Sequence, residues 1–232
     1  MKKKIIVISL GGSVILEDDE KRHFIKSLRN TLKSFYKTHK FAIVCGGGSI
    51  AREYQKILKE ERTNEKQLSL AGIRATRMNA ELIMQFFDKE ANSKLPLTMK
   101  QVKEDLEKNH IVVCGALRFA PHQTSDSTAA ELASYLKAPF INITNVRGLY
   151  TSDPRKNKNA KLIPYQTWQD FEKTAYQINF KPGQHFVLDQ KASTIIRKNR
   201  IQLYIINNDT KNLSSLLKGK KFIGTMVGPQ VC

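Results

Sequence analysis

The sequence predicts an α/β fold, a three-layer α/β/α sandwich built on a mainly parallel central sheet. Short apolar runs typical of buried strands alternate with stretches whose apolar residues recur at helical spacing. This alternation continues along all 232 residues without an internal repeat or a low-complexity block. Strand–helix alternation makes successive strands parallel and covers both faces of the sheet with helices. We therefore expect residues 1–232 to form one domain, with approximate lobes 1–140 and 141–232.

Each apolar run gives one expected strand, and each amphipathic stretch gives one expected helix. The strands are predicted at 4–9, 41–45, 110–115, 138–144, 201–207 and 222–227. The helices are predicted at 20–37, 49–61, 70–88, 125–137, 167–176 and 185–200, with a short one between the last two strands. Ser125 or Asp126 is expected to cap the helix at 125–137.

Two of these helices show a clear apolar stripe. In the helix at 20–37 the stripe consists of Phe24, Ile25, Leu28, Leu32 and Phe35. In the helix at 70–88 the candidate core residues are Leu70, Ile73, Ala80, Ile83, Phe86 and Phe87. The first stripe has apolar surface to bury, which is compatible with assembly of several chains.

The composition excludes several classes of protein. The net charge of +18 comes from lysines spread along the whole chain, without a basic arm or interleaved aromatic residues, so we expect no nucleic-acid partner. Such a surface would steer anionic substrates toward the protein. No apolar run is long enough to span a membrane, and the short run after the first lysines does not fit a targeting signal. Three widely spaced cysteines, Cys45, Cys114 and Cys232, suit free thiols in the cytoplasm.

Two glycine-rich turns are the candidate functional feature. "ISLGGS" ends the first strand and "IVCGGGS" ends the second, and a helix follows the second turn directly. Carboxyl ends of parallel strands meet at one edge of the sheet, where ligands bind. Glycine lets the main chain approach an anion, and a helix amino terminus supplies free N–H groups. The pair therefore predicts phosphate binding, although each turn alone is also compatible with a plain tight turn.

Other phosphate-transfer motifs are absent. The chain has no Walker A sequence and none of the protein-kinase motifs. Its five histidines are scattered, with no Cys/His spacing typical of zinc, so no protein metal ligand is predicted. The polar stretch at 151–162, "TSDPRKNKNAKL", predicts a loop that would serve as a lid over a site.

The ordered set of motifs resembles the amino-acid-kinase superfamily, and within it the archaeal-type uridylate (UMP) kinases. It comprises "GGSVI", "GGGSIAREY", "AGIRATRMNAEL", "TSDSTAAELASYL" and "ITNVRGLYTSDP", with a matching tail, over about residues 4–227. The resemblance implies the amino-acid-kinase fold and direct, in-line transfer of phosphate from ATP, with Mg²⁺, to UMP in the cytoplasm. It also implies an acceptor-side first lobe, an ATP-side second lobe and a homohexamer.

The resemblance assigns residues to the donor nucleotide and to catalysis. The ATP-binding residues it implies are Gly11, Gly12, Ser13, Gly48, Arg52, Thr144, Asn145, Tyr150 and Asp153. Arg52 and Asp126 are implied to be catalytic, Asp126 by organising positive groups around the reacting phosphate. The residues alone leave other interpretations open: a surface salt bridge for Arg52, a helix cap for Asp126, and a turn for Asp153 with Pro154.

The implied UMP-binding residues are Gly47, Ser69, Phe119, Ala120, Pro121, His122, Gln123, Thr124 and Ser125. The chain departs from the pattern at Ser9, where many members carry lysine, and at Ser69, where relatives carry aspartate. It departs again at Arg147, which replaces an acidic residue, and in a loop lengthened by Arg118 and Phe119.

Two other functions remain open. One is another phosphate kinase of the superfamily, such as an isopentenyl phosphate kinase, although those relatives carry a histidine beside the glycine triplet. The other is a nucleotide-binding storage or regulatory protein without turnover, which the missing lysine at Ser9 and the missing aspartate at Ser69 favour.

Overall fold

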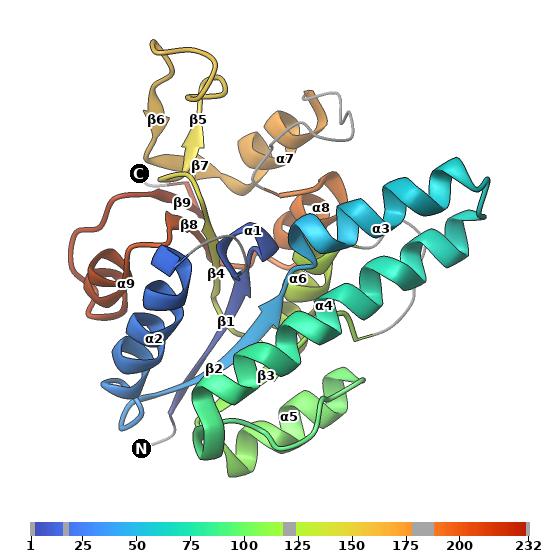
Figure 1. Ribbon diagram of the computed structural model, residues 1–232. Helices are drawn as coiled ribbons and strands as arrows, with labels where there is room; N and C mark the ends of the chain where they lie inside the picture. The colour runs from blue at the N-terminus through green and yellow to red at the C-terminus, as the bar shows by residue number, and fades with distance from the viewer. Residues whose placement is uncertain (1–2, 16–18, 118–123, 178–187, 231–232) are drawn as a thin grey trace.

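The computed structural model describes residues 3–15, 19–117, 124–177 and 188–230, with the side chains of 19–22 left out. The described chain folds around one seven-stranded sheet in the order β3-β2-β1-β4-β8-β9-β7 (Figure 1). In chain order these strands are β1 (Lys4–Leu10), β2 (His39–Cys45), β3 (Ile111–Cys114), β4 (Phe140–Thr144), β7 (Tyr165–Thr167), β8 (Leu203–Asn207) and β9 (Thr225–Gly228). All neighbours pair in parallel except β8 and β9.

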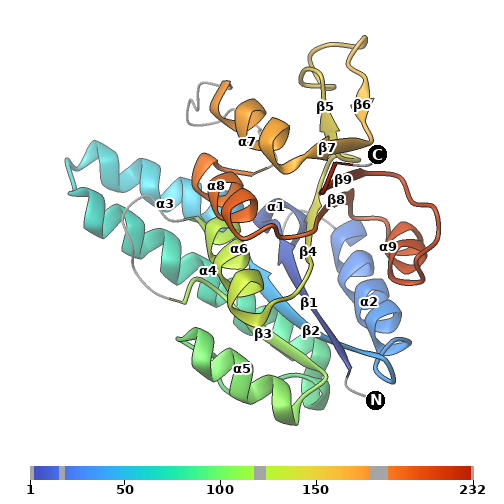
Figure 2. The same ribbon diagram turned by 180° about the vertical axis from the view of Figure 1, so that it is seen from behind.

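Helices cover both faces of the sheet, as the alternation predicts (Figures 1 and 2). The helices are α1 (Gly12–Ile15), α2 (Asp19–Lys33), α3 (Gly48–Glu60), α4 (Glu65–Phe87), η1 (Asp88–Glu90), α5 (Met99–Lys108), α6 (Ser125–Leu136), α7 (Trp168–Gln177), α8 (Gln190–Lys198) and α9 (Thr210–Leu217). One core cluster joins α2, α4 and α9 to the sheet, and the other joins α5, α6, α7 and α8 to it. The three-layer prediction is therefore confirmed.

The register of β1 explains the two cores. Ile6, Ile8 and Leu10 belong to one cluster and Val7 to the other, because successive side chains of a strand point to opposite faces. Every residue of β1 from Ile6 onward is buried, which fits a strand at the centre of a parallel sheet. The glycines that follow β1 are thereby fixed at the sheet edge.

Several predicted boundaries are corrected. The helix predicted at 70–88 begins at Glu65, because the side chain of Asn64 accepts a hydrogen bond from the Gln67 amide. The helix predicted at 20–37 ends at Lys33 and continues as turns. Neither Ser125 nor Asp126 caps α6: the cap is Thr124, whose Oγ1 accepts from the Ser127 amide at 3.1 Å.

The apolar stripe of α2 does not indicate an assembly surface. All five residues of the predicted stripe lie in the core of this chain: Phe24, Ile25, Leu28 and Leu32 on α2, and Phe35 in the turn after it. In α4, Ala80, Ile83 and Phe87 are buried as predicted, whereas Leu70, Ile73 and Phe86 are partly exposed.

Short elements were not predicted. These are α1, α5, β7 and the hairpin of β5 (Leu149–Tyr150) and β6 (Leu162–Ile163), whose connection contains the predicted loop. The side chain of Thr225 on β9 ties this hairpin to the sheet, accepting from the Leu149 amide at 2.8 Å and donating to the Ile163 carbonyl at 2.6 Å. No helix in the described part of the chain is long and apolar enough to cross a membrane.

Candidate functional site

The two glycine turns touch each other at the carboxyl edge of the sheet. A Cβ built on Gly12 would lie 2.0 Å from the Gly48 nitrogen, and one built on Gly46 would lie 2.7 Å from the Gly12 nitrogen. Gly48 has a φ of +64°, a conformation that glycine adopts without strain. Side chains at these positions would force the two main chains apart. The sequence therefore uses glycine here to bring two turns into direct contact beside the amino terminus of α3.

Three side chains of α4 hold these loops in place. Asn79 Nδ2 donates to the Gly46 carbonyl at 2.7 Å. Thr76 Oγ1 accepts from the Ala116 amide at 2.9 Å, and Arg77 Nε donates to the Ala116 carbonyl at 3.1 Å. Thr76 and Asn79 are buried, so their hydrogen bonds are shielded from water. The helix thus fixes both the second glycine turn and the start of the loop that leads from β3 to α6.

Asp126 lies at the first turn of α6 and contacts β1. Ser9, which is fully buried in β1, donates its hydroxyl to Asp126 Oδ1 at 2.8 Å. Ser9 therefore reaches this aspartate as a neutral donor. Burial raises the pKa of Asp126 to about 7; the negative charge of Asp189 raises it too, and the Ser9 hydrogen bond lowers it.

Asp189 is the second carboxylate of the site. It caps α8, accepting from the Ala192 amide at 2.8 Å, and it also accepts from Ser127 Oγ at 2.9 Å and from Thr124 Oγ1. These bonds join the amino terminus of α8 to that of α6. Together with α3, three helix amino termini meet at this edge, and their dipoles favour a bound anion there.

The ATP-side residues implied by the resemblance lie at or after the carboxyl ends of β1, β2 and β4 or in the β5–β6 hairpin. Thr144 ends β4, the strand paired with β1, Asn145 follows it, and the Gly11 amide donates to the Ile143 carbonyl at 3.2 Å. Tyr150 lies on β5 and Asp153 follows it in the hairpin connection. Hydrogen bonds from the main chain and side chain of Arg155 lower the pKa of Asp153. Main-chain hydrogen bonds to the Asp153 carbonyl also form the turn that the sequence predicts.

Of the acceptor-side residues implied by the resemblance, Gly47 packs against α4, the helix that carries Ser69. A Cβ on Gly47 would lie 3.6 Å from the Gly72 carbonyl of α4, and Ser69 precedes Gly72 by one turn. Arg52 is exposed on α3, a helix without buried residues. Thr124 and Ser125 begin α6. The predicted residues Phe119, Ala120, Pro121, His122 and Gln123, with Arg118, lie outside the described residues.

The groups that line the candidate site suit a bound phosphate chain better than a metal ion held by protein ligands alone. The described residues contain no group of three histidine, cysteine or acidic side chains that would hold a metal. The contact of the two glycine turns brings main-chain groups of both loops together beside the amino terminus of α3, and main-chain N–H groups in such a place suit phosphate oxygens. Mg²⁺ keeps waters and binds through phosphates with one or two carboxylates, a role for which Asp126 and Asp189 are the nearby carboxylates.

Sequence reasoning missed the residues that position the site. Asp189, Ser127, Thr76, Arg77 and Asn79 were not predicted, although the motifs quoted above contain most of them. A cap signal, aspartate three residues before the amide it binds, was present at Asp189. Nothing in the sequence indicates that Asn79 reaches a glycine turn 33 residues earlier.

The chain is similar to known proteins over nearly its whole length. Residues 4–207 match the Amino acid kinase family. The chain is 36% identical to a uridylate kinase of Thermococcus onnurineus over 226 residues, covering 97% of this chain and 99% of the relative. It is 34% identical to a uridylate kinase of Archaeoglobus fulgidus over 223 residues, covering 96% and 99%.

Solved structures give the same result for the fold. The crystal structure of the uridylate kinase from Archaeoglobus fulgidus superposes with a TM-score of 0.84 at 33% identity, covering 96% of this chain and 99% of that one. A UMP kinase structure from Bacillus anthracis superposes with a TM-score of 0.80 at 19% identity, covering 98% and 97%, which supports the fold alone.

Proposed function

This chain belongs to the Amino acid kinase family, and from that premise we propose that it is a UMP kinase. It transfers the γ-phosphate of ATP to UMP, giving UDP and ADP, in pyrimidine nucleotide synthesis. The observation that carries the proposal is the contact of two glycine turns beside Asp126 at the carboxyl edge of the sheet. Relatives named uridylate kinase match over nearly their whole length, which supports the choice of UMP.

The chain acts mainly by positioning the two nucleotides. The phosphate chain of ATP lies over Gly11, Gly12, Ser13 and Gly48, and the three glycines leave the main chain there without side chains. Mg²⁺, bound with ATP, neutralises charge on the transferring phosphate. Holding donor and acceptor in line removes much of the entropic barrier to the reaction.

Asp126 and Arg52 are the proposed catalytic residues. Arg52 supplies positive charge where the transferred phosphoryl group carries negative charge. Asp126, held by Ser9 at 2.8 Å, orients the positive groups around that phosphate. Asp189 is a positioning residue, because it holds Thr124 and Ser127 at the amino terminus of α6.

Other residues bind the two nucleosides. Thr144, Asn145, Tyr150 and Asp153 contact the adenosine side. Gly47, Ser69, Thr124, Ser125 and the loop at 119–123 contact UMP.

A coupled assay of ADP release tests the proposal, with UMP, CMP, AMP and isopentenyl phosphate as acceptors. We expect UMP to give the highest kcat/KM. Faster turnover of isopentenyl phosphate than of UMP would assign the chain to another kinase of the family.

A second candidate, nucleotide binding without turnover, is favoured by one observation. The position of the family lysine holds Ser9, a fully buried neutral residue. Loss of one preorganised donor removes about 2.7–4 kcal/mol of transition-state stabilisation in other enzymes. ATP binding by calorimetry without any ADP release would support this candidate over the kinase.

We also propose a cytoplasmic homo-oligomer, a hexamer by the family resemblance. Tyr54, Ile57, Met78 and Leu82 are exposed on α3 and α4, and burial of such residues in an interface is favourable. This pair of helices extends beyond the edge of the sheet in both views (Figures 1 and 2). Sedimentation of the full chain measures the number of subunits, and a monomer at micromolar concentration would contradict the proposal.

A further inference from the structure

A basic pocket lies at the sheet edge opposite the glycine turns. A cavity of about 690 Å³ opens where β1, β2 and β3 begin and where α5 and α6 end. Since β1 has seven residues, this edge is roughly 20 Å from the turns. Six basic or titratable side chains line the cavity: Lys3, Lys40, Lys103, Lys108, Lys137 and His110. Among the described lining residues, Glu107 is the only acidic one.

The described residues place Glu107 as one negative charge against the five lysines of this pocket. Within the described ranges, none of its five lysines forms an ion pair. Lys40 Nζ instead donates to main-chain carbonyls at the end of α5, those of Leu106 and, at 3.0 Å, Glu107. Lys3 Nζ lies 3.3 Å from His110 Nδ1. The carboxyl ends of α5 and α6 each contribute about half a negative charge, which is too little to balance five ammonium groups.

The lysines also repel one another. Burial lowers the pKa of Lys40, the charge of Lys3 lowers it further, and the charge of Glu107 offsets part of this shift. Burial lowers the pKa of His110 as well, and Lys3 and Lys40 add to that shift. Such mutual repulsion is relieved when an anion binds between the charges.

Lys137 occupies a position that favours glycine. It follows α6 with a φ of +50°, in the left-handed region that other side chains rarely adopt. Arg200 adopts the same conformation, with a φ of +50°, after α8. A neighbouring cavity of about 520 Å³ contains both residues. Basic side chains are thus retained at two strained positions along this edge of the sheet.

The remaining wall of the pocket is apolar. Ile5, Leu106, Leu136 and the ring of Tyr135, which is 47% exposed, form it. The volume is within the range of roughly 300–1,000 Å³ that small-molecule sites occupy. A ligand with several negative charges and an uncharged body fits this combination of walls.

We propose that this pocket binds a small molecule that carries a chain of two or more phosphates, at a site separate from the glycine turns. Lysine ammonium groups contact phosphate oxygens as point charges and need no planar partner. Two sources share this chemistry, inorganic polyphosphate and a nucleoside polyphosphate. The two ligands differ in whether an uncharged part, the nucleoside, contacts the apolar wall of the pocket.

Calorimetry on the full chain tests the proposal with two probes, inorganic tripolyphosphate and CTP. Excess UMP and a non-hydrolysable ATP analogue are present so that the glycine-turn site is occupied. The pocket variant is Lys103→Gln with Lys137→Gly, which relieves the left-handed strain and removes two charges. The matched control is Lys211→Gln with Lys218→Gln on the exposed surface of α9 and its cap.

We expect the pocket variant to bind tripolyphosphate about tenfold or more weakly, because charge-assisted hydrogen bonds are lost, and the control variant to bind it as the wild type does. The His110 ring signals should shift with tripolyphosphate in the wild type. Equal affinities of the two variants, or no binding to the wild type at millimolar concentration, would overturn the proposal.

The two probes distinguish the sources of the phosphate chain. Equal affinity for CTP and tripolyphosphate supports recognition of the phosphates alone. Tighter binding of CTP, lost in Tyr135→Ala, supports a nucleoside on the apolar wall. ADP release by the pocket variant should equal that of the wild type, so failure of this inference is separable from failure of the proposed kinase activity.

Discussion

Ser9 and Asp126 make the most informative contact of the candidate site. A buried carboxyl group that receives one neutral hydrogen bond and faces Asp189 is difficult to ionise, and the pKa of Asp126 rises to about 7. In the unfolded chain it ionises near 3.8. The native state therefore binds more protons between these values, and the contribution of Asp126 to stability falls as pH rises through that window.

Asp126→Asn should separate stability from activity. The asparagine does not ionise, so the melting temperature of the variant minus that of the wild type should be larger at pH 8 than at pH 4.5. We expect a change of a few degrees, since 1 kcal/mol moves the melting temperature by about 2–4 °C at this size. UDP formation should fall at least about tenfold. The same melting-temperature difference at both pH values would contradict the assigned pKa shift.

Arg52→Ala should reduce turnover by about tenfold or more and leave the melting temperature nearly unchanged. The structure supports the second part, since Arg52 is exposed on a helix without buried residues. Lys56→Ala, an exposed charge one turn further along α3, is the matched control and should keep normal turnover. A large loss of stability with normal turnover would make Arg52 a structural residue.

At the scale of elements, the contact between the two glycine turns is the feature to change. Gly12→Ala places a Cβ 2.0 Å from the Gly48 nitrogen, so the turns must separate. We expect ATP affinity to fall by about tenfold or more and the protein to lose stability. Gly72→Ala is the control: its Cβ meets only the flexible end of Gln55, and alanine favours helix α4.

If Gly12→Ala and Gly72→Ala bind ATP equally well by calorimetry, the glycine turns do not form the phosphate-binding site.

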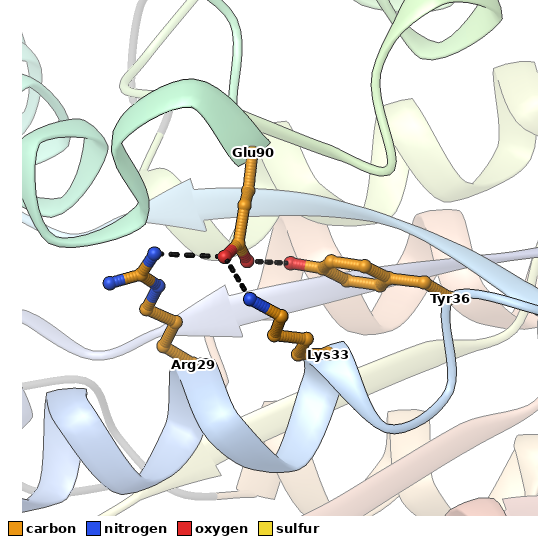
Figure 3. A network of polar contacts seen from close by, with 4 residues as sticks. All are labelled: Arg29, Lys33, Tyr36 and Glu90. Carbon is orange, nitrogen blue, oxygen red and sulfur yellow. Dashed lines mark hydrogen bonds and ion pairs between the residues drawn. The ribbon is translucent and has the colours of Figure 1, made fainter.

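A polar network fastens α2 to η1. Glu90 accepts from Arg29 at 2.8 Å, Lys33 at 2.9 Å and Tyr36 at 2.8 Å (Figure 3). Burial alone would raise the pKa of Glu90, but these hydrogen bonds lower it to about 2. A lowered native pKa means that the stabilisation is present above about pH 4.5 and disappears as the pH falls toward 2.

Glu90→Gln should therefore cost about 2 kcal/mol at pH 7 and much less at about pH 2. Urea unfolding at the two pH values measures the difference. Glu104→Gln removes an exposed pair with Lys100 at 3.8 Å and should cost less than about 0.5 kcal/mol at either pH. A pH-independent cost for the Glu90 variant would mean that the network acts through packing alone.

At the scale of the whole molecule, the sequence predicted the layers and the main strands because apolar runs report burial directly. It predicted the two glycine turns at one edge because parallel strands carry their ends to the same side. It did not predict α5, β7 or the contacts of Asn79 and Asp189, since these depend on which segments fold against each other. The stripe of α2 illustrates the same limit, because its burial within this chain is a tertiary fact.

Transfer of label from γ-³²P-ATP to UMP tests the central claim most directly. The geometry of the glycine turns and Asp126 predicts labelled UDP, no label retained on the protein, and loss of labelled UDP in Gly12→Ala. Binding of ATP and UMP without any labelled UDP would contradict the claim and leave a nucleotide-binding protein without turnover.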